Sequence, residues 1–341
     1  MDSKASKGSQ RARYGRVLIM LASLLGALTG ILSGCASAHG AASGVTPSVP
    51  SPTTTPPTPA TTVLPSDVTI SCPGSALGTF LSCQYAGPDN TRMTFYLYVP
   101  PGYTGSSPAQ QYPLVLILQG GGERANPQQS ATQNRALAIN ASYVTPWVAT
   151  GGANVQARWP CFVVVPQVVG NNRYVNVPPT VSSYALATQP SASLQMAINI
   201  VALIERRYPD IDANRLYITG ISMGGFGVWD AIERWPTLFA AAVPVSGAGD
   251  PALASRIVRL PLWAFHGAND NRVPVAGSRT MIQALRAAGG TPCYTELAGM
   301  SHTIWPQVYG QTAHPNNPLY PWLFAQTKNG PLPGAPACGG A

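Results

Sequence analysis

Charged residues are scarce in this sequence, since Asp, Glu, Lys and Arg make up only 9% of its 341 residues. The formal net charge is +8, and half of it belongs to residues 1–34, which hold five basic residues and one acidic residue. A nucleic-acid partner usually requires a clustered basic face. The weak positive bias that remains gives no reason to predict one.

Histidine and cysteine are also sparse, with four and six residues. They form no CxxC motif and no His/Cys cluster of the kind that holds structural zinc. No metal site is therefore predicted. Five cysteines lie beyond position 35, and an odd number leaves at least one thiol unpaired or paired between chains.

These five cysteines predict two disulfides if the chain reaches an oxidising compartment. Cys72 and Cys83 flank a short glycine-containing segment with the pattern of a hairpin, and we expect them to pair. Cys161 lies in the apolar run CFVVVPQ, which favours a buried free thiol. Cys293 and Cys338 remain as the second pair.

The first 34 residues have the pattern of an export signal. Basic residues precede the apolar run VLIMLASLLGALTGIL, which ends in small residues at LSGC. A transmembrane anchor is the alternative, because the run has about the minimum spanning length. LSGC also resembles the lipobox of bacterial lipoproteins, in which the chain is cut before the cysteine and the thiol carries a diacylglyceryl group. The resemblance implies that Cys35 becomes a lipidated first residue and that a membrane is a partner.

Residues 36–66 consist almost entirely of Ala, Gly, Ser, Thr and Pro. Such a segment cannot bury enough apolar area to offset its ordering entropy. We therefore expect three parts: a lipoprotein signal peptide at 1–34, a lipidated tether at 35–66, and one folded domain at 67–341. The protein would be exported and anchored to the cell envelope, at an outer membrane or the cell surface, or else secreted.

The folded part alternates between strand-like and helical patterns. Continuous apolar runs are typical of strands that are buried on both faces, and alternating strands and helices favour a mainly parallel sheet with helices on both faces. The expected strands are 94–100, 114–119, 162–167, 215–220, 240–247, 261–267 and 292–299, and the expected helices are 193–208, 226–236 and 278–290. In such α/β sheets, ligands bind beyond the carboxyl ends of the strands.

A serine motif lies between one of these strands and a helix. Gly220-Ile221-Ser222-Met223-Gly224 fits G-x-S-x-G, with the strand RLYIT before it and a helical pattern after it. This motif alone is common in a glycine-rich chain, so its context decides its meaning. A strand–turn–helix bend is too sharp for side chains on its flanks, and it presents the serine hydroxyl above the sheet. A simple glycine turn is the alternative.

A serine nucleophile needs a base, and the base needs an acid to orient it. His302 is the favoured base because it directly follows the last expected strand. His39 lies in the tether, His266 ends a strand and is expected to organise its turn, and His314 lies further on in a loop.

The acid must also lie at the carboxyl edge of the sheet. Asp270 follows the strand PLWAFHG and is favoured, with Asp250 after the preceding strand as its rival. Asp230 lies in the helix after the serine and is expected to point elsewhere. The chain order Ser222, Asp270, His302 is that of α/β-hydrolases.

An acyl-transfer site also needs two backbone N–H donors for the developing oxyanion. Met223, directly after the serine, is expected to supply one. The loop LILQGGGER after an early strand is expected to supply the other through Gly121. A tight turn is the alternative role for this loop.

Together these residues resemble the α/β-hydrolase superfamily, and more narrowly the secreted bacterial esterases of the polyhydroxybutyrate-depolymerase-like, feruloyl-esterase-like and "predicted peptidase" group. The matching segments are QGGGER, VVVPQ, NRLYITGISMGGFGVWD, PLWAFHGANDNRVPV and SHTIWPQVY. The resemblance implies a serine esterase with a triad of Ser222, Asp270 and His302, oxyanion donors Met223 and Gly121, an ester substrate and no cofactor. Gln119 departs from this group, which usually has a histidine there.

Three other functions remain open. A serine peptidase would use the same triad on amides. A depolymerase would act on an extracellular polyester or polysaccharide ester and would favour exposed aromatic residues around the cleft. Trp305 is expected near the site, whereas Trp229 is expected in the core. A non-catalytic binding module on a tether would be expected to have a broken triad.

Overall fold

The structure is a computed structural model, and it describes residues 64, 66–105, 110–149, 155–310 and 318–338. These residues all belong to Thr54–Ala341, the larger of two units into which the chain divides. The predicted signal peptide, the lipidation site Cys35 and the tether up to residue 63 lie outside the described residues. Within the described residues, no helix has the length and apolar character needed to span a membrane.

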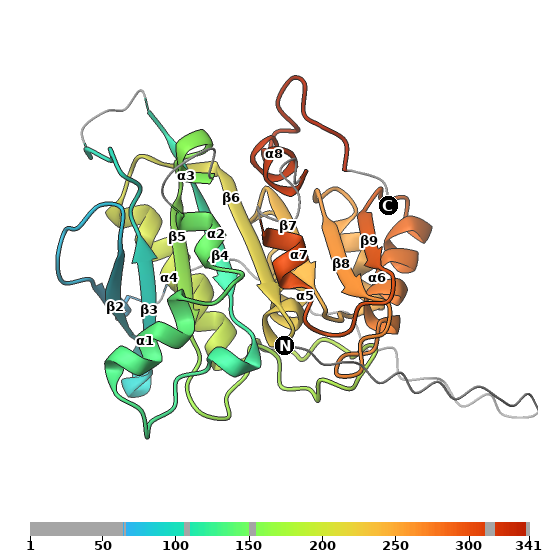
Figure 1. Cartoon of the computed structure of the whole chain (residues 1–341), viewed down its shortest axis with the longest axis horizontal. Coiled ribbons are helices and arrows are strands. Elements are labelled where there is room, and N and C mark those ends of the chain that lie inside the picture. Colours follow the sequence, from blue (N-terminus) through green and yellow to red (C-terminus); the bar gives the residue numbers. More distant parts are fainter. Residues whose placement is uncertain (1–63, 65, 106–109, 150–154, 311–317, 339–341) are drawn as a thin grey trace, which may run out of the picture. The chain divides into compact units, whose positions relative to one another are not determined.

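Nine strands form a single sheet in the order β1-β2-β3-β5-β4-β6-β7-β8-β9 (Figure 1). The strands are β1 (Thr69–Ser71), β2 (Phe80–Ala86), β3 (Arg92–Tyr98), β4 (Tyr112–Leu118), β5 (Phe162–Gln167), β6 (Ile211–Ile221), β7 (Ala241–Val245), β8 (Trp263–Gly267) and β9 (Cys293–Leu297). All neighbours from β5 to β9 are parallel. The β1–β2, β2–β3 and β3–β5 pairs are antiparallel. The expected mainly parallel sheet is therefore confirmed, with an antiparallel edge added to it.

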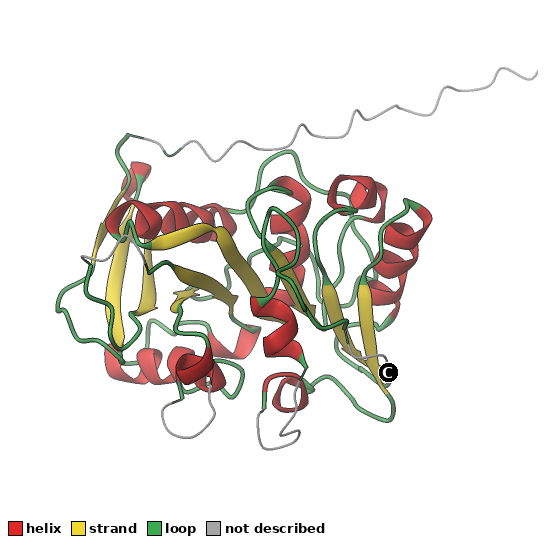
Figure 2. Ribbon diagram, turned by 90° about the horizontal axis from the view of Figure 1, so that it is seen from above, coloured by secondary structure: helices red, strands yellow, loops and turns green. Residues whose placement is uncertain are grey.

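Helices cover both faces of this sheet (Figure 2). They are α1 (Ala131–Ile139), α2 (Thr145–Val148), α3 (Val155–Arg158), α4 (Ala192–Arg207), α5 (Met223–Arg234), α6 (Ala276–Ala287), α7 (Trp305–Tyr309) and α8 (Leu319–Phe324). Three short 3₁₀ helices accompany them: η1 (Pro88–Asn90), η2 (Gly121–Glu123) and η3 (Pro251–Ile257). The three expected helices correspond to α4, α5 and α6. The five others are short or weakly amphipathic, so their periodicity did not predict them.

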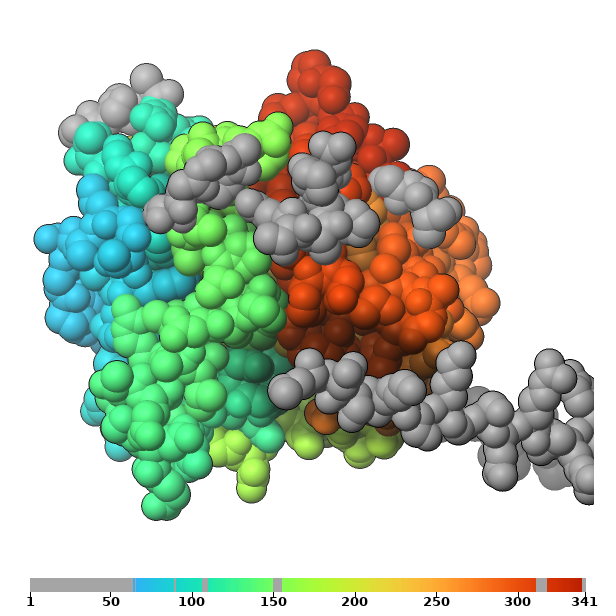
Figure 3. Space-filling model, viewed as in Figure 1, coloured from blue at the N-terminus to red at the C-terminus, as the bar shows by residue number. Residues whose placement is uncertain are grey.

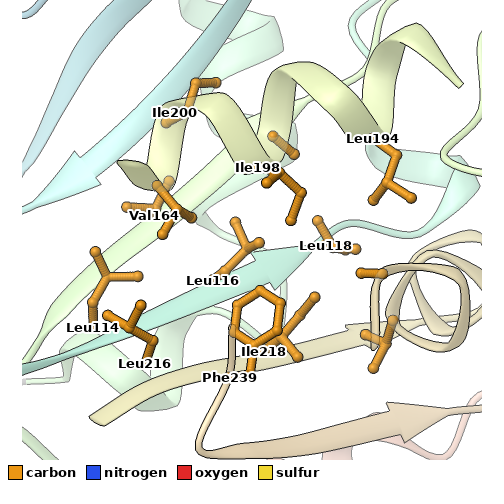
Figure 4. Packing of buried hydrophobic residues seen from close by; sticks show 14 of the residues in the cluster. Leu114, Leu116, Leu118, Val164, Leu194, Ile198, Ile200, Leu216, Ile218 and Phe239 are labelled. Carbon is orange, nitrogen blue, oxygen red and sulfur yellow. The ribbon is translucent and has the colours of Figure 1, made fainter. Parts of the chain in front are cut away.

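The central strands are apolar on both faces because both faces are covered. On β4, Leu114, Leu116 and Leu118 belong to the core cluster that contains Leu194 and Ile198 of α4 (Figure 4). The alternate residues of β4 belong to a second cluster with residues of α1, α2, α7 and α8. Each fully buried Leu or Ile stabilises the fold by roughly 1.5–3 kcal/mol relative to an exposed side chain. Because alternate residues of a strand point to opposite faces, burial of both sets holds the strand between two layers of helices.

The second cluster joins segments that lie far apart in the sequence. The Trp147 ring on α2 packs edge-on against Tyr320, with ring centroids 4.9 Å apart. Trp159 stacks on Phe324 of α8, with centroids 5.3 Å apart. In Figure 3 the green surface around α1 and α2 accordingly adjoins the orange and red surface of the C-terminal segments. These aromatic contacts fix the end of the described chain against the sheet.

Two disulfides link the pairs expected from the sequence. Cys72, directly after β1, is bonded to Cys83 on β2. Cys293, the first residue of β9, is bonded to Cys338. Cys161 is a free and buried cysteine, as predicted. The bonds tie an edge hairpin together and fasten the C-terminal segment to the opposite edge strand.

Candidate active site

Ser222 occupies the sharp turn between β6 and α5. Its φ is +51° and its ψ is −115°, a strained conformation for a residue with a side chain. A Cβ on Gly224 would overlap the carbonyl oxygen of Leu118, and a Cβ on Gly220 would lie 2.7 Å from the carbonyl oxygen of Gly224. The two glycines of the motif are therefore required by close backbone packing, and the turn leaves the serine side chain at the sheet edge.

The structure brings Ser222, His302 and Asp270 together in one hydrogen-bonded chain. The Ser222 Oγ lies 2.9 Å from His302 Nε2. The other ring nitrogen, His302 Nδ1, lies 2.7 Å from Asp270 Oδ2. Asp270 follows β8 and His302 follows β9, so the parallel arrangement of β6, β8 and β9 places all three residues at one edge of the sheet.

Asp270 is buried among groups that stabilise its charge. Its Oδ1 accepts hydrogen bonds from the backbone N–H groups of Arg272, at 2.8 Å, and Val273, at 2.9 Å. His266 Nε2 lies 3.3 Å from its Oδ2. Burial alone would raise the pKa of Asp270, but the hydrogen bonds from His266, His302 and the two amides together lower it well below its ordinary value. Asp270 is therefore a carboxylate at neutral pH.

The rival residues have other partners. Asp250 caps η3, where it accepts from Ala252 N, and it also accepts from Leu186 N at 2.8 Å. Asp230 is paired with Arg234 within α5. Neither carboxylate has His302 as a hydrogen-bond partner. Both histidines at positions 39 and 314 lie outside the described residues.

Two backbone amides are available beside the serine. Met223 is the first residue of α5 and Gly121 is the first residue of η2, so their N–H groups have no acceptor within the helix. Both residues line the cleft that contains Ser222. The N–H of Gly120 is different, because it donates to Tyr143 Oη at 3.2 Å. Gln119 is buried, and its side-chain amide has no hydrogen-bond partner among the described residues.

The cleft has a volume of about 530 Å³ and lies over Ser222 and His302. Trp305 lines it, with its ring edge-on to the ring of His302 and the centroids 5.6 Å apart. Trp229 is fully buried in the core, as expected. Within the described residues, no group of three or more His, Cys, Asp or Glu side chains is arranged to hold a metal ion.

Sequence reasoning missed several residues of this cleft. Arg124, Arg173 and Arg272 all line it, together with Glu123 and Val175. Arg124 lies in the segment QGGGER and Arg272 in PLWAFHGANDNRVPV, which hold the expected oxyanion donor Gly121 and the expected acid Asp270. Their closeness in sequence to these residues could have predicted a place in the cleft. The segment that holds Arg173 and Val175 carries no motif, and its place at the cleft follows only from the folded chain.

A serine on a strand–helix turn, above a parallel sheet whose later strands are followed by an aspartate and a histidine, defines the α/β-hydrolase fold. Residues 89–291 match the model of the family described as "Putative esterase". This match covers more than half of the chain, so the chain belongs to that esterase family.

The chain is also similar to individual known proteins. A curated relative, the bifunctional acetylxylan esterase/xylanase XynS20E of Neocallimastix patriciarum, is 24% identical over 220 residues, which are 64% of this chain. A solved thermostable esterase is 33% identical with a TM-score of 0.60, and the match covers 73% of this chain and 63% of that one. An acylaminoacyl peptidase of Pyrococcus horikoshii, 14% identical with a TM-score of 0.51 over 73% of this chain and 42% of that one, shares the fold.

The chain spans only part of these proteins. It covers 27% of the length of the curated acetylxylan esterase/xylanase and less than two thirds of the thermostable esterase. The peptidase match shows a common fold and nothing about the substrate.

Proposed function

We propose that the chain is a serine hydrolase that cleaves carboxylic esters. The observation that carries this proposal is the hydrogen-bonded chain from Ser222 through His302 to Asp270, at 2.9 Å and 2.7 Å, in an open cleft. Membership of the esterase family supports an ester rather than an amide as the substrate. The proposed chemistry uses only protein groups and water.

In the proposed first step, His302 Nε2 takes the proton of Ser222 as the serine oxygen attacks the ester carbonyl. Asp270 keeps the imidazole oriented through Nδ1 and stabilises the imidazolium that forms. Its lowered pKa suits this role, because the ionised carboxylate accepts the Nδ1 hydrogen bond more strongly than a neutral carboxyl group and balances the new positive charge.

The tetrahedral intermediate places a negative charge on the former carbonyl oxygen. The N–H groups of Met223 and Gly121 are proposed to donate to this oxyanion. The protonated His302 then gives its proton to the departing alcohol, which leaves an acyl group on Ser222. Water, deprotonated by His302, then attacks the acyl carbonyl at the same oxyanion site. The bond to Ser222 Oγ breaks, His302 returns the proton to that oxygen, and the acid is released.

The direct test is hydrolysis of p-nitrophenyl butyrate by the full chain beside its Ser222→Ala variant. We expect kcat to fall roughly 10⁴- to 10⁶-fold in the variant, as in other serine hydrolases without their nucleophile. The matched control is Ser255→Ala, which changes an exposed serine on η3 and is expected to retain full activity. Equal activity of wild type and Ser222→Ala would refute the proposal.

The same protein distinguishes an esterase from a peptidase. The butyryl p-nitroanilide differs from the ester in one atom at the scissile bond. A preference for the ester beyond the difference in intrinsic reactivity supports the proposal. Cleavage of peptide amides at rates comparable with esters would instead favour the peptidase alternative.

We further propose that the protein is exported and lipid-anchored. Two disulfides support an oxidising compartment, and the LSGC segment supports lipidation of Cys35. Metabolic labelling with a fatty-acid analogue is expected to mark the wild-type protein and to leave Cys35→Ala unmarked. Labelling of neither protein, or of both, would contradict an anchor at this cysteine.

A further inference from the structure

The cleft over Ser222 carries an unusual charge distribution for a chain with so few charged residues. Three arginines line it, and each comes from a different segment: Arg124 after β4, Arg173 before α4, and Arg272 after β8. Among the described residues that line the same cleft, Glu123 is the one carboxylate. Three basic residues and one acidic residue are therefore among those that line the cleft around the proposed nucleophile.

Glu123 offsets these cations at most in part. Burial raises the pKa of its carboxyl group, and hydrogen bonds from Tyr143 and from backbone groups oppose this only in part. None of the three arginines forms an ion pair with Glu123 or with any other carboxylate among the described residues. Even with Glu123 and Asp270 both ionised, three arginines against two carboxylates leave a net positive charge around the cleft.

The guanidinium groups of these arginines retain unused donors. Arg124 Nε donates to the carbonyl oxygen of Gly121 at 3.0 Å, which leaves its terminal N–H groups free of described acceptors. The side chains of Arg173 and Arg272 have no hydrogen-bond acceptor among the described residues. An arginine offers five N–H donors in a fork that matches a carboxylate or phosphate.

Three arginines elsewhere in the described chain have carboxylate partners. Arg215, Arg234 and Arg279 form ion pairs with Asp212, Asp230 and Glu296. Arg173 is half-buried like Arg215, yet it forms no ion pair with a carboxylate of the described residues. Its backbone is held in place, because its carbonyl oxygen accepts from Ser191 Oγ at 3.0 Å. Other arginines of the described chain, such as Arg92 and Arg286, also form no ion pair with a described carboxylate. What distinguishes the cleft is that three such arginines from different segments meet at one site.

We propose that this cleft selects anionic esters, in which the acyl part or the alcohol part carries a carboxylate or a similar anionic group close to the scissile bond. The proposal rests on the ester-hydrolase function above and names its substrate class. An anionic group would pair with Arg173 or Arg272 beside the cleft, while the ester carbonyl lies at Ser222 and the amides of Met223 and Gly121. Such pairing raises kcat/KM by steering and by binding.

The test compares matched esters with the full chain. For a charge on the acyl side, mono-p-nitrophenyl glutarate is compared with p-nitrophenyl valerate. For a charge on the alcohol side, 4-valeryloxybenzoate is compared with its methyl ester. Each kcat/KM is divided by the rate of alkaline hydrolysis of the same ester, which removes differences in leaving-group reactivity. We expect the charged ester to be preferred about tenfold in at least one pair, the size of one good charged contact.

Variants then assign the preference to the cleft. Arg173→Gln and Arg272→Gln are each expected to lower the charged-to-neutral ratio of kcat/KM by several-fold. Arg286→Gln, which changes an exposed arginine on α6, is the matched control and is expected to leave the ratio unchanged. Added NaCl is expected to lower the ratio in the wild type, because salt screens exposed charges.

The outcomes separate this inference from the function on which it rests. If the wild type hydrolyses the neutral esters through Ser222 but prefers the charged ester in neither pair, the inference is overturned and the esterase proposal stands. A preference that persists in both variants and in high salt also overturns it. Failure to hydrolyse any of the four esters would count against the esterase proposal itself.

Discussion

The carboxylate of Asp270 has two histidines beside it, and only one of them contacts Ser222. His266 Nε2 lies near two acceptors, the Val273 carbonyl oxygen at 3.1 Å and Asp270 Oδ2 at 3.3 Å. This nitrogen must therefore carry a proton. Nδ1 lies 2.7 Å from the Ser278 hydroxyl, which also contacts the Gly247 carbonyl oxygen at 3.3 Å. His266 is thus a positioning residue for Asp270, in addition to the expected role in its turn.

Replacing His266 is expected to change the pH dependence of hydrolysis. Burial raises the pKa of Asp270, and the His266 hydrogen bond is among those that lower it, so His266→Ala moves this pKa upward. In the wild type, Asp270 stays ionised well below pH 4 and produces no loss of kcat/KM above that pH. Between pH 4 and pH 5, His266→Ala is expected to lose more activity than the wild type. At pH 7 its kcat is expected to be about tenfold lower, because one lost hydrogen bond costs about 1.4 kcal/mol.

The conservative variant His266→Gln provides the control, because its amide can still donate to Asp270 and accept from Ser278. It is expected to retain more activity at low pH than His266→Ala. If both variants follow the wild-type pH profile after correction for folded protein, His266 has a structural role only.

The turn between β6 and α5 depends on the lack of side chains at its flanks. In Gly224→Ala the new Cβ would overlap the Leu118 carbonyl oxygen, so β4 and the start of α5 must move apart. We expect a loss of roughly 1–3 kcal/mol in the free energy of unfolding, together with a large loss of esterase activity. Urea denaturation measures the first effect and p-nitrophenyl butyrate hydrolysis the second.

Gly122→Ala is the control for this stability measurement, since a Cβ on Gly122 would meet no atom within 4 Å and no positive φ is recorded for it. Its free energy of unfolding is expected to change little. An unchanged stability in Gly224→Ala would show that the turn accommodates a side chain after all.

The last turn of α5 buries three ionisable side chains, Asp230, Glu233 and Arg234. Burial raises the pKa of Glu233 well above its ordinary value, and the neighbouring Asp230 and Asp250 carboxylates raise it further. A hydrogen bond from the Asp250 amide and the positive charge of Arg234 oppose this shift only in part. Tyr184 also faces this group. Glu233 is therefore expected to keep its proton at pH values where the unfolded chain has lost it.

This shift gives a signed prediction for stability. The folded-state pKa lies above the unfolded value of about 4.3, so the contribution of Glu233 is complete below that pH. It is lost as pH rises through the folded-state pKa, by at most about 1.4 kcal/mol per pH unit. Glu233→Gln cannot titrate, and its free energy of unfolding is expected to fall less than that of the wild type between pH 5 and pH 8. Parallel pH curves would contradict a protonated Glu233.

For the molecule as a whole, the free thiol reports on the integrity of the core. Burial raises the pKa of Cys161 to about 12, although a hydrogen bond from Gln156 opposes the shift. Thiols react as thiolates, so iodoacetamide is expected to leave Cys161 unmodified in the native protein and to modify it in guanidinium chloride. Peptide mass mapping separates Cys161 from every other cysteine. Rapid modification of Cys161 in the native protein would show that this part of the core opens.

The sequence by itself determined the features that depend on local physics. A strand that is buried on both faces is a continuous apolar run, without alternating polar residues. Seven strands were predicted mainly from such runs, and each of them coincides with a strand of the sheet. The glycines around Ser222 predicted the sharp turn, because the steric limits of a backbone bend are visible within five residues. Both disulfide pairs were predicted from the hairpin pattern and from the apolar surroundings of Cys161. The signal peptide, the tether and the lipidation of Cys35 stay predictions.

Only the tertiary structure decided the features that depend on strand order. Asp250 and Asp270 both follow strands at the same sheet edge, and the sequence favoured Asp270 but kept Asp250 as a rival. Folding places Asp270 beside His302 and gives Asp250 a capping role. The antiparallel edge and the convergence of Arg124, Arg173 and Arg272 likewise arise from segments that are distant in sequence. Contacts of this kind are set by the packing of the whole sheet, and no short stretch of sequence encodes them.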